Sequence, residues 1–188
     1  MLTKEDDKVI EKVESFLRQK RSEYGGGNLW IWALKIPQRQ RIEELFEKAE
    51  ELDEFLKSKS DQEKVSVLDL GCGFCTYWPI FQLRGCNTFV GIDLFDARVK
   101  ESQSYQKTAN EVAQEFCSQS EFHILSGDVR DINILFENHG LKNIEKFDII
   151  FTKNTDYTKM KSTGIPEKIF DSICDKWLKD DGKKIYAG

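Results

Sequence analysis

The residues of this sequence that could do chemistry stand at the ends of apolar runs. Asp69, Gly71 and Gly73 close the first run, Asp93 closes the second and Asp128 closes the third. Glycines one residue apart let backbone N–H groups and a following helix N-terminus approach a polar or anionic ligand group closely. A carboxylate about 20 residues beyond such a turn has the spacing of one that holds a ribose diol. The pattern therefore predicts a nucleoside site.

The neighbours of these residues indicate which nucleoside binds. Asp128 offers an acceptor for an exocyclic amine, and Val129 offers a backbone N–H for a ring nitrogen, which together describe an adenine. A nicotinamide-binding turn would have a third glycine where Thr76 stands, and it would not call for Asp69 two residues before the first glycine. Asp69 instead indicates that this end of the ligand carries a positive group. Aspartates also cap helices and turns, but three at successive strand ends favour a ligand.

Alternating strands and helices are needed to bring these residues together. That alternation predicts a doubly wound α/β fold with a mostly parallel sheet of about five strands, and ligands bind at the carboxyl ends of such strands. The apolar periodicities predict strands at 65–70, 88–93, 122–125, 147–152 and 184–187, the last after a turn at 181–182. Helices are predicted at 76–83, 97–117, 132–138 and 166–179.

Two amphipathic helices are predicted before the sheet. The first follows a capping box of Thr3 and Asp6, and the second runs from Pro37 to about Lys57. The glycines 25–27 between them form a hinge, and the aromatic residues beside it either close as a lid over the site or anchor the helices on the sheet; they are Tyr24, Trp30 and Trp32. We expect residues 1–60 to be a helical extension or lid packed on the core, and residues 61–188 to be the ligand-binding α/β domain.

Four motifs in order resemble those of the class I S-adenosylmethionine-dependent methyltransferases. They are Asp69-Leu-Gly-Cys-Gly73, Gly91-Ile-Asp93, Gly127-Asp-Val129 and Phe147-Asp-Ile-Ile-Phe-Thr-Lys-Asn154. The resemblance covers Val65 to about Gly188, and it implies the Rossmann-like methyltransferase fold with S-adenosylmethionine as cofactor. The family sheet usually has seven strands, whereas this chain stops at the fifth. We expect either a trimmed piece or an edge strand that a helix or a second subunit of a homodimer covers.

The resemblance also implies roles for single residues. Asp69 and the backbone of Gly71, Cys72 and Gly73 would face the methionine part of the cofactor. Asp93 would hold the ribose and Leu94 would pack near the adenine. Asp128 would accept from the adenine amine, and Val129 would donate its backbone N–H to the ring. Asn154 would touch the methionine end and the reaction face.

The chemistry needs little from the protein beyond placement. The sulfonium methyl group is already electrophilic, so catalysis is mostly in-line alignment of a nucleophile in a dry pocket, which can supply roughly 7–11 kcal/mol. A base is required only if the nucleophile must lose a proton. Besides Asn154, the nearest catalytic candidates after the fourth strand are Asp156 and Tyr157.

The acceptor is expected to be a small molecule. The segment after the fourth strand lacks signatures resembling those of amino-methylating or cytosine C5 nucleic-acid enzymes and of arginine methyltransferases. Two other functions stay open: an aminopropyltransferase-like enzyme on the same fold, and a non-catalytic cofactor-binding or interaction module. An acidic cluster for polyamines would favour the first, and the missing strands and the lack of an obvious base favour the second.

Composition sets outer limits on these functions. The 188 residues, 39% of them hydrophobic, suffice for one domain, and the net charge of −5 does not favour a nucleic-acid partner. With 32% charged residues, the sequence has no apolar run suited to a membrane. Five cysteines, an odd number, predict reduced thiols and a cytoplasmic protein. Cys72 and Cys75 could be a redox pair or half a metal site, but small residues filling a tight turn are the favoured reading, so we expect no metal.

Overall fold

The strands form one parallel sheet in the order β3-β2-β1-β4-β5. The computed structural model describes residues 2–25, 30, 34, 37–49, 52–59, 64–94, 100–141, 144, 146–153 and 165–187. The strands are β1 (Val65–Leu70), β2 (Cys86–Asp93), β3 (Glu121–Ser126), β4 (Phe147–Lys153) and β5 (Leu178–Ala187). The order 3-2-1-4-5 is that of the nucleotide-binding doubly wound fold, in which the strand order reverses between β1 and β4. The predicted Rossmann-like α/β fold is confirmed.

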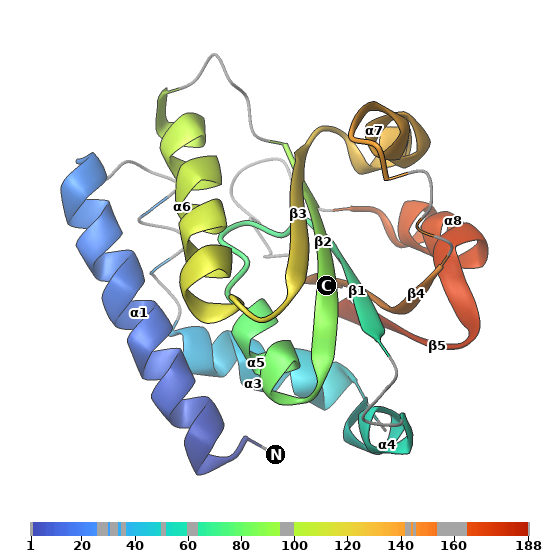
Figure 1. The fold of residues 1–188 in the computed structure, drawn as a ribbon, viewed down its shortest axis with the longest axis horizontal. Coiled ribbons are helices and arrows are strands. Elements are labelled where there is room, and N and C mark those ends of the chain that lie inside the picture. The colour runs from blue at the N-terminus through green and yellow to red at the C-terminus, as the bar shows by residue number, and fades with distance from the viewer. Residues whose placement is uncertain are drawn as a thin grey trace.

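Helices cover both faces of this sheet (Figure 1). They follow the strands in the order α5 (Trp78–Leu83), α6 (Lys100–Phe116), α7 (Ile132–Asn138) and α8 (Glu167–Trp177). Figure 1 shows α5 and α6 on one side, and α7 and α8 on the other. Successive strand residues alternate between the two cores, as with Val67 on the α5 side and Leu68 on the α7 side. Central strands buried on both faces explain the near-continuous apolar runs of the sequence.

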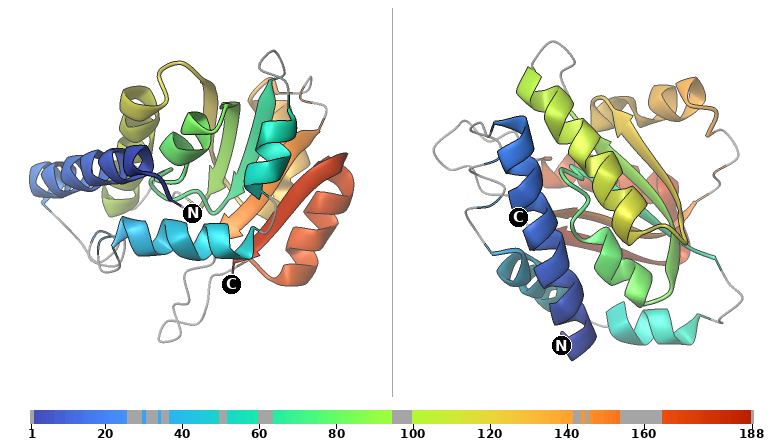
Figure 2. Two further views of the ribbon diagram at one scale, coloured as in Figure 1. Left: turned by 90° about the horizontal axis from the view of Figure 1, so that it is seen from below. Right: turned by 60° about the vertical axis from the view of Figure 1, so that its left-hand side comes forward.

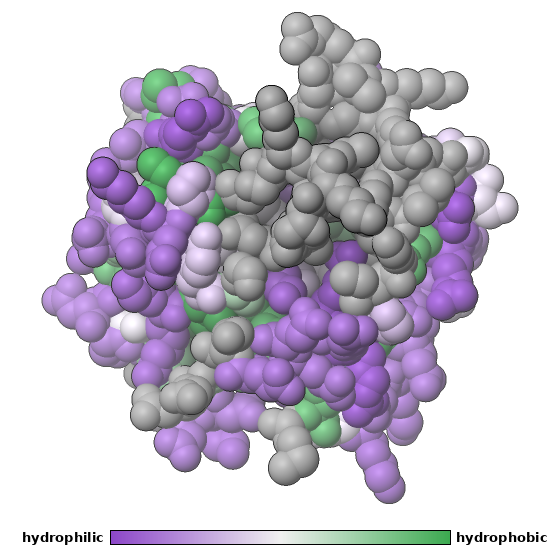
Figure 3. All heavy atoms as spheres, turned by 180° about the vertical axis from the view of Figure 1, so that it is seen from behind, coloured by the Kyte–Doolittle hydropathy of each residue, from purple (hydrophilic) through white to green (hydrophobic). Residues whose placement is uncertain are grey.

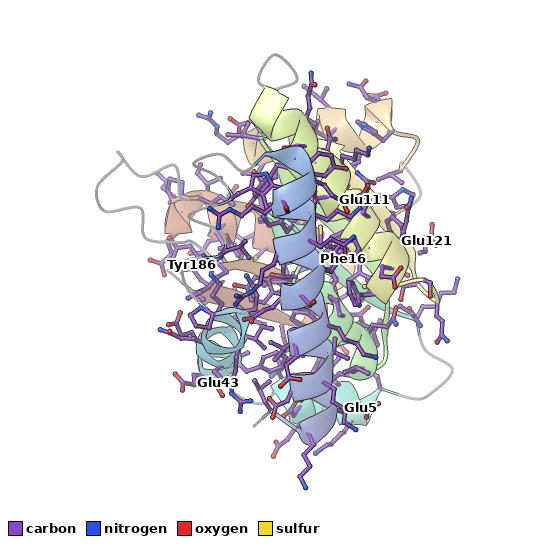
Figure 4. All side chains as sticks on the ribbon, turned by 90° about the vertical axis from the view of Figure 1, so that its left-hand side faces the viewer. Glu5, Phe16, Glu43, Glu111, Glu121 and Tyr186 are labelled. Atoms are coloured by element: carbon purple, nitrogen blue, oxygen red, sulfur yellow. The ribbon has the colours of Figure 1, made fainter. Side chains whose placement is uncertain are left out.

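The N-terminal region packs on the α5 side of the sheet. Helix α1 (Lys4–Tyr24) begins at the predicted capping box, in which Thr3 Oγ1 accepts from the N–H of Asp6 at 3.2 Å and Asp6 Oδ2 accepts from the N–H of Thr3 at 2.7 Å. Figure 4 shows α1 crossing in front of α6, where the rings of Phe16 and Phe116 meet edge to face with centroids 5.6 Å apart. The extension and the sheet therefore share buried apolar side chains.

The prediction of one helix from Pro37 to Lys57 is wrong. The chain forms α3 (Gln38–Lys48) and α4 (Leu52–Ser58), and Ala49 between them has a non-helical backbone with φ −102° and ψ 57°. Each helix buries its own apolar residues in the core, such as Leu45 on α3 and Phe55 on α4. Helix α3 packs against β5, beside which it lies in Figure 2.

The last strand also differs from the prediction. Strand β5 begins directly after α8 at Leu178, and the expected turn at Asp181 and Gly182 lies inside it. The register passes from Phe147 opposite Leu178 to Ile149 opposite Lys183, so the extra residues form an irregularity within the strand. Within the described part of the chain, β5 pairs with β4 alone.

The described surface is mostly polar. On the face shown in Figure 3 it is mainly hydrophilic, with smaller hydrophobic areas between. The large hydrophobic side chains that the described residues expose are Leu83, Leu94 and Ile134. Among the described helices none is both long enough and apolar enough to cross a bilayer.

Candidate functional site

The turn between β1 and α5, residues 71–77, is called the glycine turn below. Positive φ angles alternate along it, at Gly71 (+82°), Gly73 (+53°) and Cys75 (+57°). The N–H groups of Gly71 and Cys72 both donate to the carbonyl of Ile92, at 2.8 and 3.2 Å, which fixes the turn to the end of β2. A Cβ atom built on Gly71 would meet no atom within 4 Å. The turn thus keeps open space beside it for a closely approaching group.

Asp93 joins the end of β2 to the glycine turn. Its Oδ2 accepts from the N–H of Gly73 at 2.7 Å, and its Oδ1 accepts from the N–H of Leu94 at 2.7 Å. Burial raises the pKa of Asp93, although the two N–H groups act in the opposite direction. A carboxylate has about four acceptor positions, so two remain for a diol. The spacing in the sequence therefore brings Asp93 to the glycine turn, as the ribose assignment requires.

Asp69 lies inside the sheet near the end of β1. The residue is 1% exposed, and its Oδ2 accepts from Nε1 of Trp78 at 2.8 Å. Burial raises the pKa of Asp69 well above its ordinary value; the hydrogen bond from Trp78 lowers it and the nearby charge of Asp93 raises it. The charge of half-buried Asp93 therefore acts on buried Asp69 at the carboxyl ends of β1 and β2, and within the described chain neither forms an ion pair with a cationic side chain.

Trp78 is a site residue that the sequence reasoning missed. Its ring stacks on Phe89 of β2, with centroids 5.2 Å apart and planes at 14°. Gly91 makes this possible, since a Cβ there would lie 2.7 Å from Trp78 and 2.8 Å from Cys72. The glycine in the Gly91-Ile-Asp93 motif therefore lets the first helix and the glycine turn approach β2. The signal that could have found Trp78 is its place in the first turn of that helix.

The two cysteines of the glycine turn are buried and free. Burial raises the pKa of both thiols, and the two side chains hydrogen-bond to each other. Cys72 is 4% exposed and Cys75 is not exposed. A buried thiol with a raised pKa is a poor nucleophile and metal ligand. Across the described residues, no group of three or more His, Cys, Asp or Glu side chains could hold a metal ion.

Asp128 differs from the other two aspartates because it pairs with a cation. It caps the short 3-10 helix η1 (Val129–Asp131), and its Oδ1 accepts from the N–H of Arg130 at 2.9 Å. The Arg130 guanidinium also holds the carboxylate, with Nε at 2.8 and 2.9 Å from the two oxygens. These side-chain hydrogen bonds lower the pKa of Asp128 to about 2. Arg130 is a second residue that the sequence reasoning missed, and it occupies oxygens assigned to the adenine amine.

The remaining predicted residues are placed as follows. Leu94 is 64% exposed directly after Asp93, and Val129 is partly buried against the core on the α7 side. Asn154, Asp156 and Tyr157 lie outside the described residues. The structure thus brings the predicted cofactor residues that it describes to the ends of β1, β2 and β3, while the roles of Asn154, Asp156 and Tyr157 stay predictions.

Trp30 packs as an anchor beside the glycine turn. It is 1% exposed, and its ring centroid lies 4.5 Å from that of Phe74 in the turn. Phe74 in turn contacts Tyr105 of α6 at 3.7 Å between centroids, and Nε1 of Trp30 donates to Ser104 Oγ at 3.4 Å. The N-terminal region therefore supports the turn from one side. Trp32, also expected here, lies outside the described residues.

The end of β4 is held by the N-terminal region. Nζ of Lys153, the last residue of β4, donates to Oε2 of Glu44 on α3 at 2.8 Å. The Lys153 side chain is 14% exposed and the Glu44 side chain 40% exposed. Helix α3 therefore stands beside the β4 end, where the catalytic candidates follow in the sequence.

Comparison with known proteins finds similar structures. No family model matches the chain, and no curated protein matches it. The chain is similar to an S-adenosylmethionine-dependent methyltransferase from Thiobacillus denitrificans in complex with S-adenosyl-L-homocysteine, with 20% identity over 77% of this chain and 47% of that one and a TM-score of 0.45. It is also similar to a protein from Pyrococcus horikoshii, with 22% identity over 80% of this chain and 57% of that one and a TM-score of 0.46. For the Trypanosoma brucei PRMT1 enzyme-prozyme complex with AdoHcy, the identity is 20% over 70% of this chain and 36% of that one, and the TM-score is 0.47. The chain thus spans about half the length of these solved structures or less.

Proposed function

We propose that this chain binds S-adenosylmethionine at the carboxyl ends of β1, β2 and β3 and transfers its methyl group to a small molecule. The observation that carries the proposal is the pair of carboxylates at the strand ends, buried Asp69 and half-buried Asp93, in which burial raises both pKa values. Removing charge from water is costly unless an opposite charge compensates. A ligand that combines an adenosine with positive charge supplies that compensation.

The described residues fit this cofactor from one end to the other. Asp93 has free acceptor positions for a ribose diol beside the glycine turn. Gly71 leaves space for the amino-acid end, where Asp69 favours a positive group. Exposed Leu94 offers an apolar surface for the adenine. When bound, S-adenosylmethionine supplies an electrophilic methyl group on a sulfonium.

The small-molecule acceptor is supported by charge and by position. A net charge of −5 does not favour a polyanion. The acceptor would enter beside the end of β4, where Lys153 and α3 form one wall. Asn154, Asp156 and Tyr157 follow in the sequence, and we assign to them the alignment of the acceptor and, where needed, removal of its proton. Alignment of the reacting atoms is the main contribution asked of the protein.

Calorimetric titration with S-adenosylmethionine and S-adenosylhomocysteine tests the cofactor assignment. Wild-type protein should bind both, and Asp93→Ala should bind each at least 100-fold more weakly, because it loses charge-assisted hydrogen bonds to two hydroxyls. Asp180→Ala is the matched control, since the Asp180 side chain is fully exposed at the other end of the sheet. Folded wild-type protein that binds neither compound would contradict the proposal.

Turnover separates the enzyme from a binding module. Wild-type protein with S-adenosylmethionine should release S-adenosylhomocysteine when a suitable small acceptor is present. The same assay with decarboxylated S-adenosylmethionine tests the aminopropyltransferase alternative. Cofactor binding without turnover across a broad acceptor panel would favour a non-catalytic module instead.

A further inference from the structure

Tyr77 carries a buried hydroxyl that the proposed function does not yet use. It is the last residue of the glycine turn and is 8% exposed. Its ring meets Phe151 of β4 edge to face, with centroids 5.7 Å apart and planes at 80°. Phe151 is the register partner of Asp69. Tyr77 therefore stands at the point where the strand order reverses, which is where ligands bind in such sheets.

The hydroxyl oxygen of Tyr77 has no hydrogen-bond partner among the described residues. Burial of an unpartnered hydroxyl costs free energy, and native proteins seldom keep such a group. The ring alone makes the contact with Phe151, so packing does not need the oxygen. A partner supplied by a ligand would explain why the chain has tyrosine here.

Charged residues of α3 face the same region. Ile42 and Leu45 of α3 belong to the same buried core as Tyr77. Arg41 and Glu44, three residues apart, are neighbours on the helix surface. Burial gives the largest increase in the pKa of Tyr77, the charge of Arg41 lowers that pKa, and the charges of Asp69 and Glu44 raise it. The side chains of Arg41 and Glu44 are therefore close enough to act on the hydroxyl.

Positive charge on the α3 side favours an anion. Of the charged groups that act on the pKa of Tyr77, Arg41 has the largest effect, and Lys153 compensates the charge of Glu44 through a 2.8 Å hydrogen bond at the end of β4. Asp69, deeper in the sheet, has the opposite sign. A ligand group that carries a negative oxygen would find a hydroxyl donor and positive charge on the α3 side.

We propose that the Tyr77 hydroxyl donates a hydrogen bond to a carboxylate of the bound ligand, with Arg41 supplying positive charge on the α3 side. The inference rests on the proposed function, because it assigns a residue to the same crevice. The carboxylate belongs either to the amino-acid end of the cofactor or to the acceptor. In both cases the hydroxyl binds a carboxylate, and the two cases differ in which molecule carries that carboxylate.

Removal of one carboxylate from the ligand tests the first source. S-Adenosylmethionine and decarboxylated S-adenosylmethionine are titrated into wild-type protein and Tyr77→Phe by calorimetry. For a cofactor carboxylate, Tyr77→Phe weakens binding of S-adenosylmethionine at least tenfold, or about 1.4 kcal/mol. The affinity of Tyr77→Phe for decarboxylated S-adenosylmethionine stays within twofold of the wild-type value.

A thermal shift series tests the second source. Both proteins are saturated with S-adenosylhomocysteine and heated with a panel of small aliphatic and aromatic carboxylates. For an acceptor carboxylate, at least one compound raises the melting temperature of wild-type protein, and Tyr77→Phe loses that rise although it binds S-adenosylmethionine normally.

Tyr186→Phe is the matched control, because it removes the same atom from the other side of the sheet. The Tyr186 hydroxyl donates to the carbonyl of Ile165 at 3.0 Å. This control should lower the melting temperature and leave both ligand responses unchanged, whereas Tyr77→Phe should not lower the melting temperature of the free protein. Equal responses of wild type and Tyr77→Phe in both series overturn the inference alone. Wild-type protein that binds no S-adenosylmethionine overturns the proposed function and this inference with it.

Discussion

Aspartates with little exposure are held in opposite ways in two regions of the molecule. Among the described residues, Asp69 and Asp93, at the carboxyl ends of β1 and β2, accept only from Trp78 and from backbone N–H groups. Asp6, at the start of α1, accepts from the guanidinium of Arg84 at 2.7 and 3.0 Å. Burial raises the pKa in both regions, yet the net pKa of Asp6 is lowered because Arg84 and the hydrogen bonds from Thr3 together outweigh burial.

The amino ends of the strands repeat the paired arrangement. Asp148 at the start of β4 is 1% exposed and accepts from Ser66 of β1 through both N–H and Oγ at 2.9 Å. Nζ of Lys179 lies 2.9 Å from both of its oxygens. Although burial raises the pKa of Asp148, these donors hold it below its ordinary value.

The contrast separates aspartates that stabilise the fold from aspartates that are left for a ligand. A buried carboxylate that only supports the fold is compensated within the chain, as in Asp6 and Asp148. Asp69 and Asp93 lack such a cation in the described chain, so the free protein bears the cost of their burial. An aspartate with no cationic partner in the described chain therefore indicates a ligand site at one end of the sheet, and an aspartate paired with a cation indicates a structural ion pair at the other.

The largest effect is expected when the ion pair between Arg84 and Asp6 is broken. Arg84→Met should lower the free energy of unfolding by about 3–5 kcal/mol, because it leaves the carboxylate of Asp6 buried without a counter-charge. The side chains of Arg84 and Asp6 are 12% and 2% exposed. Urea denaturation followed by far-UV circular dichroism measures this change.

Arg39→Met serves as the exposed counterpart on α3. Arg39, whose side chain is 49% exposed, pairs with Asp7 and with Glu43, and exposed pairs of this kind contribute about 0–1 kcal/mol. Similar losses from Arg84→Met and Arg39→Met would show that Asp6 does not depend on its cation, and the contrast between the two regions would fail.

The next prediction compares the regions through their pH dependence. The reference pKa is 3.8 for each aspartate. Because the folded pKa of Asp148 is lowered, its contribution is present above pH 3.8 and is lost as the pH falls through the folded value. Because the folded pKa of Asp69 is raised, ionisation above pH 3.8 costs stability until the folded value is passed. As the pH rises from 3 to 7, wild type should therefore gain stability relative to Asp148→Asn and lose it relative to Asp69→Asn.

Unfolding free energies from urea titrations at several pH values give both differences. The expected loss in Asp148→Asn at pH 7 is about 1.5–3 kcal/mol, since the charge-assisted hydrogen bonds from Ser66 and Lys179 are weakened and the Lys179 side chain, 39% exposed, is solvated in the variant. As the pH rises, the stability of wild type relative to Asp148→Asn and its stability relative to Asp69→Asn must change in opposite directions. A change in the same direction would show that the charge of Asp69 is compensated within the chain and is not left for a ligand.

The sequence predicted the strands and the aspartates at their ends, but not the cations that pair with Asp6 and Asp148. Short apolar runs bounded by turn residues predicted β1 to β4 and the aspartates at the ends of the first three, because these depend on local apolar pattern and turn chemistry. Arg84 lies 78 residues from Asp6, and Lys179 lies 31 from Asp148. Such pairs follow from how distant elements meet, which no local pattern records.

Two local errors have the same origin. The apolar stripe continues from α3 into α4, so its periodicity did not reveal the break at Ala49, which appears only once both helices pack on the sheet. The turn expected at Gly182 is an irregularity inside β5, where a Cβ would lie 2.9 Å from the carbonyl oxygen of Asp148. That close approach is set by the pairing with β4, not by the residues of the turn.

The smallest effect is expected at Asp128, which combines features of both regions. It stands at the carboxyl end of β3, yet Arg130 pairs with it, and the Arg130 side chain is 69% exposed. Arg130→Met should raise the pKa of Asp128 from about 2 toward its ordinary value, measured by NMR titration of the carboxyl carbon. Since the pair is solvent-screened, the melting temperature should not change.

The same variant tests the role of Asp128 in cofactor binding. If Asp128 accepts from an adenine amine, S-adenosylmethionine should bind Arg130→Met at least as tightly as wild type, because no guanidinium competes. Weaker binding would instead make Arg130 part of the cofactor site, and the carboxyl ends of the strands would then use a cation of their own.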